Sequence, residues 1–233
     1  MGPEISVNNL SLSLNGRTIL APVNAQLAAG QLHLLVGPNG AGKTSLLRSL
    51  LGLTAYRGEI IRHWPGKAQR PVYIPQQPRF DQVLPVTCAD FLLSAVSRRP
   101  VFLGAGLKRR QQVTDLLCRV GMQDKAGLQL GRLSGGERQR LMFALALSRP
   151  ADLWFLDEPM TGLDTEGQTL FAELILSLRA EEKTLIMVHH DMQFVAQHAD
   201  NVLLVDGGLK QSGHPHLLSL PETSFGSAMA EVA

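Results

Sequence analysis

The chain has 233 residues, a formal net charge of +2, 45% hydrophobic residues and 18% charged residues, which is ordinary for a globular protein and argues against extensive disorder. The near-balanced charge gives no case for a nucleic-acid partner. No apolar run is long enough for a membrane-spanning helix, the N-terminus lacks the regions of a signal peptide, and the two cysteines form no metal-type or redox-type pair, so we expect a cytoplasmic protein.

The first third of the chain predicts a small antiparallel sheet, then a buried strand, a glycine-rich turn and a helix. Apolar residues alternate over Ile5–Leu14, and the Asn-Gly pair that follows is a strong hairpin signal. Leu32–Val36 is continuously apolar, as expected for a strand buried on both faces, and Lys43–Leu51 has helical spacing. Further strand candidates are Ile19–Leu20, Ala25–Leu27, Arg57–Ile61 and Val72–Ile74.

From roughly Gln77 to Leu133 the periodicity is helical, which predicts a helical lobe inserted into the core. Strands then alternate with helices, a pattern that indicates a mostly parallel sheet with helices on both faces. We therefore expect one α/β domain over residues 1–233, with a helical subdomain at about 77–133 and a less patterned tail at about 214–233. The elements expected here are helices at Thr87–Val96, Lys108–Val120, Gly167–Arg179 and Met192–His198, and strands at Leu153–Leu156, Thr184–Val188 and Val202–Val205.

Residues 37–44 match the pattern G-x-x-x-x-G-K-[ST] between the buried strand and the helix. In such a loop, backbone N–H groups converge on phosphate oxygens and the helix N-terminus adds a partial positive charge. Lys43 can reach the terminal phosphates, and the Thr44 hydroxyl can ligate Mg²⁺. The residues assigned to this predicted nucleotide site are Gly37, Pro38, Asn39, Gly40, Ala41, Gly42, Lys43, Thr44 and Ser45.

A second apolar strand, Leu153–Leu156, is followed directly by Asp157 and Glu158. Ligands lie at the carboxyl ends of the strands in parallel sheets, so both carboxylates are expected near the phosphates. We expect Asp157 to hold Mg²⁺ through a water molecule, and Glu158 to activate the water that attacks the γ-phosphorus. An Asp-Glu pair after a strand more often simply begins a loop. The pair is predicted to be functional here because the same chain has the glycine-rich phosphate loop.

Leu133–Arg140, with the sequence LSGGERQR, is similar to the signature motif of the ABC ATPases, the nucleotide-binding subunits of ABC transporters. The resemblance extends over nearly the whole chain and implies a P-loop NTPase core with an inserted helical subdomain that hydrolyses ATP with Mg²⁺. The serine and glycines open a helix, which makes a second phosphate-binding N-terminus. We expect it to close over ATP held by a partner, in a homodimer or with a paired ABC ATPase subunit. Its assigned residues are Ser134, Gly135, Gly136 and Glu137.

The resemblance also implies roles for isolated residues. Gln76, with Gln77 as its rival, matches the Q-loop glutamine that contacts Mg²⁺ or water, and Asp164 matches the D-loop aspartate that crosses the dimer interface. His190 matches the switch histidine that contacts the γ-phosphate. Leu14 stands where the family commonly stacks adenine on an aromatic ring, which predicts weak selectivity for the base.

The Pro78–Asp81 motif and the run Leu84–Phe91 are similar to the ATPases of zinc, manganese and iron(II) chelate-type importers. This resemblance implies a permease in the membrane as partner, a substrate-binding protein as indirect partner, and a peripheral position on the inner face of the cell membrane. Importers of haem, siderophores or cobalamin are alternatives, as are exporters. A soluble ABC ATPase of chromosome maintenance or repair is the alternative of another class, although the heptad runs of such proteins are not seen in this sequence.

Overall fold

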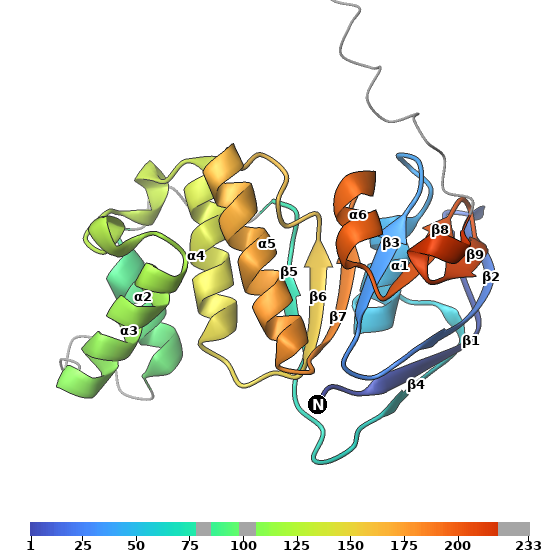
Figure 1. Ribbon diagram of the computed structural model, residues 1–233, viewed down its shortest axis with the longest axis horizontal. Coiled ribbons are helices and arrows are strands. Elements are labelled where there is room, and N and C mark those ends of the chain that lie inside the picture. Colours follow the sequence, from blue (N-terminus) through green and yellow to red (C-terminus); the bar gives the residue numbers. More distant parts are fainter. Residues whose placement is uncertain (78–84, 98–105, 219–233) are drawn as a thin grey trace, which may run out of the picture. The chain divides into compact units, whose positions relative to one another are not determined.

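The computed structural model describes residues 1–77, 85–97 and 106–218 (Figure 1). The Pro78–Asp81 motif, Leu84 and residues 219–233 of the expected tail lie outside the described residues. The described chain forms two compact units, each considered by itself. The first comprises Met1–Tyr73, Ala151–Glu158 and the described part of Leu176–Ala233, and the second comprises Ile74–Pro150 and Pro159–Ile175.

A six-stranded sheet, counted over the described residues, has the strand order β5-β6-β7-β3-β8-β9. The pairs among β6, β7, β3 and β8 are parallel, and β9 is antiparallel to β8. All residues of β3, β6 and β7 are buried, which explains their continuous rather than alternating apolar sequences. The strands are β3 (Leu32–Val36), β5 (Val72–Ile74), β6 (Leu153–Asp157), β7 (Thr184–Val188), β8 (Asn201–Val205) and β9 (Leu209–Gly213).

The N-terminal strands form a separate antiparallel sheet with the order β2-β1-β4. Its strands are β1 (Glu4–Leu14), β2 (Arg17–Leu27) and β4 (Arg57–His63). Leu10 and Leu20 of this sheet share one buried core with Leu47 of helix α1 (Lys43–Leu51) and with Phe155 of β6. Burying each such side chain contributes roughly 1.5–3 kcal/mol, so this core fixes α1 and the loop before it relative to β6. The predicted antiparallel subdomain is thereby confirmed.

Helices α2 (Cys88–Val96), α3 (Leu107–Arg119) and α4 (Gly135–Leu147) pack against one another in the second unit. Helix α2 begins one residue later than expected because Thr87 is its N-cap, whose hydroxyl accepts a hydrogen bond from the Asp90 amide at 3.1 Å. Two 3₁₀ turns, Gln123–Lys125 and Leu130–Arg132, lead into α4. Because α4 packs on α2 and α3, this unit extends past residue 133.

Three elements complete the described chain: α5 (Thr165–Ala180), α6 (Met192–His198) and the 3₁₀ turn Pro215–Leu217. Helix α5 begins two residues before the predicted Gly167, because Asp164 accepts a hydrogen bond from the Gly167 amide at 2.9 Å and so caps the first turn. None of the described helices is both long and apolar enough to cross a lipid bilayer.

Candidate nucleotide-binding site

The loop between β3 and α1 folds around its own lysine side chain. Lys43 Nζ donates to the carbonyl oxygens of Gly37 and Pro38, each at 2.8 Å. Gly37 has a φ of 144°, and a Cβ added there would lie 2.0 Å from the carbonyl oxygen of Val205. Only glycine permits so close an approach of two backbones, so this residue lets the loop turn tightly against β8.

The loop and the start of α1 line a cavity of about 300 Å³ in the first unit. Helix α1 has no acidic residue in its first turn, so no carboxylate there neutralises the partial positive charge of its N-terminus. Such a helix start binds phosphate groups well. The lining residues are Ile19, Asn39, Gly40, Ala41, Gly42, Lys43, Thr44, Ser45 and Glu158.

Asp157 is held by two hydroxyl groups at the end of β6. Thr44 Oγ1 donates to its Oδ1 at 2.8 Å, and the Tyr73 hydroxyl donates to its Oδ2 at 3.3 Å. Burial raises the pKa of Asp157, while the hydrogen bond from Thr44 lowers it. Mg²⁺ prefers hydroxyl and carboxylate oxygens as ligands. The oxygens of Thr44 and Asp157 that meet here therefore fit that ion.

Glu158 occupies a strained backbone position beside the cavity. Its φ is 47°, in the left-handed region that a residue with a side chain seldom adopts, and its amide donates to the Val188 carbonyl at 3.2 Å. Burial lowers the pKa of Lys43, and the negative charges of Glu158 and Asp157 oppose that shift. One ammonium group and two carboxylates therefore share this end of the sheet.

Two histidines follow β7 in succession. His189 is only 4% exposed, and its ring packs edge-on against Phe194 with ring centres 4.8 Å apart. Burial lowers the pKa of His189 to about 4. His190, the residue matched to the switch histidine, is exposed, with its ring centre 5.6 Å from that of His189.

Leu14, assigned to base contact, ends β1 with its side chain 51% exposed. The aliphatic residue that lines the cavity beside the loop is Ile19, on β2. Its sequence neighbour Leu20 packs so closely on the loop that a Cβ added to Gly42 would lie 2.7 Å from the leucine Cδ2. Packing of Leu20 thus brings Ile19 to the loop.

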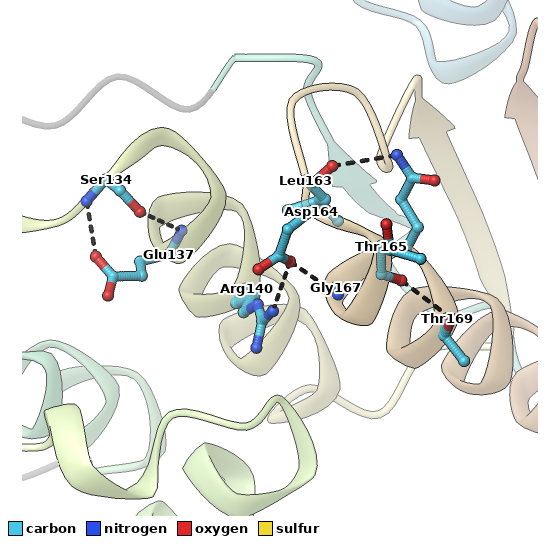
Figure 2. Close-up of polar contacts among 9 residues, drawn as sticks. Ser134, Glu137, Arg140, Leu163, Asp164, Thr165, Gly167 and Thr169 are labelled. Atoms are coloured by element: carbon cyan, nitrogen blue, oxygen red, sulfur yellow. Dashed lines mark hydrogen bonds and ion pairs between the residues drawn. The ribbon is translucent and has the colours of Figure 1, made fainter.

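The second unit contains the Leu133–Arg140 segment, which we call the signature segment. Ser134 caps α4: its hydroxyl accepts from the Glu137 amide at 3.2 Å, and its own amide donates to the Glu137 carboxylate at 2.8 Å (Figure 2). Lys125 Nζ lies 3.2 Å from Glu137 Oε1. These contacts lower the pKa of Glu137, chiefly through the hydrogen bond from the Ser134 backbone.

The signature segment shares a cleft of about 580 Å³ with the D-loop segment, which we define as Thr161–Asp164. Ser134, Gly135 and Asp164 are exposed there. Gln76, also in this unit, is exposed directly after Pro75, whose carbonyl oxygen accepts from the Gln139 side chain at 3.3 Å. Gly136 and Glu137, which the sequence also predicted for the second phosphate site, line the same cleft.

Three residues, Tyr73, Arg140 and Ile19, contact site residues or line the cavity although no site role was predicted for them. The partner of Tyr73 lies 84 residues away in the sequence and that of Arg140 lies 24 residues away. A motif contains no signal for such pairings. Two clues were available: Tyr73 lies in an expected strand, Val72–Ile74, and Arg140 ends the signature motif.

Comparison with known proteins identifies relatives of this chain. A family model described as ABC transporter matches residues 20–161. The chain is 34% identical over 210 residues to the manganese transport system ATP-binding protein MntB of Halalkalibacterium halodurans, covering 88% of this chain and 84% of that protein. It is 37% identical over 219 residues to the zinc import ATP-binding protein ZnuC of Ruegeria pomeroyi, covering 93% and 80%.

Among solved structures, an ATP-binding subunit of an ABC transporter superposes with a TM-score of 0.74 at 22% identity, covering 90% of this chain and 89% of that one. At that identity the superposition supports the fold. The family match and the sequence relatives together establish the class: this chain belongs to the ABC transporter family.

Proposed function

We propose that this chain is the ATP-binding and ATP-hydrolysing subunit that energises a transmembrane importer of a divalent metal ion, manganese or zinc. The observation that carries the ATPase assignment is that Lys43, Thr44 and Glu158 line one cavity, with Asp157 hydrogen-bonded to the Thr44 hydroxyl behind it. The cargo assignment draws on the relatives, which are named for manganese transport and zinc import.

In this proposal the glycine-rich loop binds the triphosphate, Thr44 would hold Mg²⁺ directly, and Asp157 would hold it through a water molecule. The family resemblance implies that Gln76 contacts the ion or its water. Bound Mg²⁺ neutralises charge on the phosphate oxygens. Glu158 accepts a proton from the attacking water as its oxygen bonds to the γ-phosphorus and the bond from that phosphorus to the β,γ-bridging oxygen breaks, which leaves that oxygen on ADP. The products are ADP and phosphate, and His190 contacts the γ-phosphate during the reaction.

The partner protomer supplies Ser134, Gly135 and Gly136 to the same ATP, while its Asp164 approaches the interface. ATP binding then draws two subunits together and hydrolysis separates them, so that the helical unit moves a permease in the membrane. We place one ABC ATPase domain, comprising both units, on the cytoplasmic face of the membrane. A substrate-binding protein would deliver the metal from the other side.

A deletion strain and the purified chain test the two parts of this proposal. The chain should hydrolyse ATP, and Lys43→Ala should lower kcat by about 100-fold, since it removes the cation that faces the terminal phosphates. Cells that lack the chain should lose manganese or zinc, measured by elemental analysis at limiting metal, and regain it with the parental chain but not with Lys43→Ala. Unchanged metal content together with an active ATPase would overturn the cargo assignment.

A further inference from the structure

The D-loop segment is fixed to one face of helix α4 at two points. A Cβ added to Gly136 would lie 3.2 Å from Leu163 Cδ2, so the leucine packs directly on this glycine. One turn further along α4, Arg140 Nη2 lies 3.2 Å from Asp164 Oδ1 (Figure 2). Residues four apart share a helix face, so both contacts lie on the same side of α4.

The same carboxylate oxygen of Asp164 also holds the start of α5. It accepts from the Gly167 amide at 2.9 Å, and the carbonyl oxygen of Leu163 accepts from Gln168 Nε2 at 3.1 Å. The Asp164 side chain is nevertheless 73% exposed. Asp164 is thus held in one orientation while most of its side chain remains exposed at the rim of the cleft.

Arg140 lies in a space left by two glycines. Its side chain is 14% exposed. A Cβ added to Gly121 would lie 3.1 Å from Nη1, and one added to Gly167 would lie 2.9 Å from Nη2 and 2.7 Å from Asp164 Oδ1. Glycine in the first turn of a helix lowers the stability of that helix. The space that Gly167 leaves for the guanidinium explains why glycine stands at this position.

We propose that Arg140 is a positioning residue that joins the D-loop segment to the signature helix α4, so that both surfaces offered to the partner protomer move as one body. This inference rests on the proposed function, because it takes Asp164 and Ser134 to face a second copy of the chain. An exposed ion pair seldom adds much to stability. The enclosed guanidinium and its bond to a helix-capping carboxylate point instead to control of orientation.

We call the attachment of the D-loop segment to α4 through Arg140 the joint. Hydrogen exchange in the nucleotide-free chain tests whether this joint exists, and the test does not involve the partner protomer. In Arg140→Met, we expect the Gly167 amide, resolved by NMR, to exchange about tenfold faster, because its acceptor is no longer held in place. Arg119→Met removes an exposed arginine at the end of α3 and is the matched control, with parental exchange at Gly167. Parental exchange in Arg140→Met would overturn the joint.

Pairing of two chains tests the consequence. In the Glu158→Gln background, Arg140→Met should need about tenfold more ATP for half-maximal pairing in sedimentation experiments, while the ATP affinity of dilute single chains stays parental. In the hydrolysing chain, the same substitution should raise the KM for ATP by about the same factor, because only paired chains hydrolyse ATP in our proposal. Arg140→Lys, which keeps the charge but not the planar fork, should restore part of both losses.

Gly167→Ala supplies an independent variant if Arg140→Met does not fold. Alanine is the better helix former, so a role in α5 alone predicts parental or improved pairing, whereas the joint predicts impaired pairing. If Gly167→Ala and Arg140→Met both pair as the parent does, the inference is wrong. If the Glu158→Gln parent itself does not pair with ATP, the proposed function fails, and the exchange experiment still decides whether the joint exists.

Discussion

Tyr73 contributes to the site through Asp157. Its hydroxyl donates to Asp157 Oδ2 at 3.3 Å and accepts from Arg48 Nε at 3.4 Å, while Thr44 occupies the other carboxylate oxygen. A carboxylate fixed at both oxygens presents its remaining lone pairs in a defined direction. Groups that orient a metal ligand in this way commonly influence metal affinity.

We therefore expect Tyr73→Phe to raise the Mg²⁺ concentration for half-maximal ATP hydrolysis by about tenfold, with ATP binding in EDTA unchanged. Tyr56→Phe, a change at the other tyrosine in the chain, is the control and should behave as the parent does. Equal Mg²⁺ requirements in the two variants would show that the Tyr73 hydroxyl has no effect on the ion.

His189 should make the stability of the first unit depend on pH. Its folded pKa of about 4 is below the ordinary value of 6.5, because burial disfavours the charged ring. Below pH 6.5 the unfolded chain therefore binds a proton that the folded chain does not. The free energy of unfolding should fall as pH drops from 6.5 to 4, by up to about 3 kcal/mol from this residue.

Urea unfolding, followed at several pH values across that window, checks this expectation. His189→Gln should flatten the pH dependence, and the buried His33, whose pKa burial also lowers, should account for part of the remaining slope. An identical slope in His189→Gln would contradict the assignment.

At the scale of elements, the second unit has two helix caps of the same kind, of which one has a predicted role in binding and the other stabilises its helix only. Ser134 caps α4 and Thr87 caps α2, each accepting a hydrogen bond from the third helical residue. Replacing either by alanine should lower the free energy of unfolding by about 1 kcal/mol. Only Ser134→Ala should also abolish ATP-driven pairing, because only α4 presents its N-terminus to the partner's nucleotide in our proposal.

Chemical denaturation and sedimentation of the two variants provide the comparison. Thr87→Ala controls for the lost cap, since the destabilisation is matched and the exposed surface of the signature segment is unchanged. If both variants lose pairing equally, the effect belongs to helix stability and Ser134 has no separate role.

For the molecule as a whole, local signals in the sequence predicted elements well where an apolar run was unbroken or helical spacing was regular. Leu32–Val36, Thr184–Val188 and Lys43–Leu51 have the same bounds in the structure as in the prediction. These segments are specified by unbroken apolar runs or by helical spacing beside a glycine-rich turn, so no distant partner is needed to recognise them.

Features that depend on tertiary contacts could not be predicted in this way. β2 is one continuous strand over Arg17–Leu27, whereas its sequence indicated two short pieces, because pairing along β1 carries it through the polar residues between. Helix α5 begins before Gly167 because of a cap at Asp164, and that cap is held by an arginine 24 residues earlier. Side-chain pairing over such distances leaves no trace in local periodicity.

The central claim is that the glycine-rich loop of one chain and the signature segment of another hold the same ATP. Mixing two disabled chains tests it directly, with Glu158→Gln present in both so that nucleotide is trapped rather than hydrolysed. One chain also carries Lys43→Ala, and the other carries Ser134→Ala. Each alone should neither pair nor trap ATP, whereas a dimer of one chain of each kind has one intact site and can therefore form.

The equal mixture should therefore trap up to about half of the nucleotide per chain that the Glu158→Gln parent traps, measured after gel filtration. Sites built within single chains would gain nothing from mixing. A mixture that traps no more ATP than the two variants do separately would contradict the account.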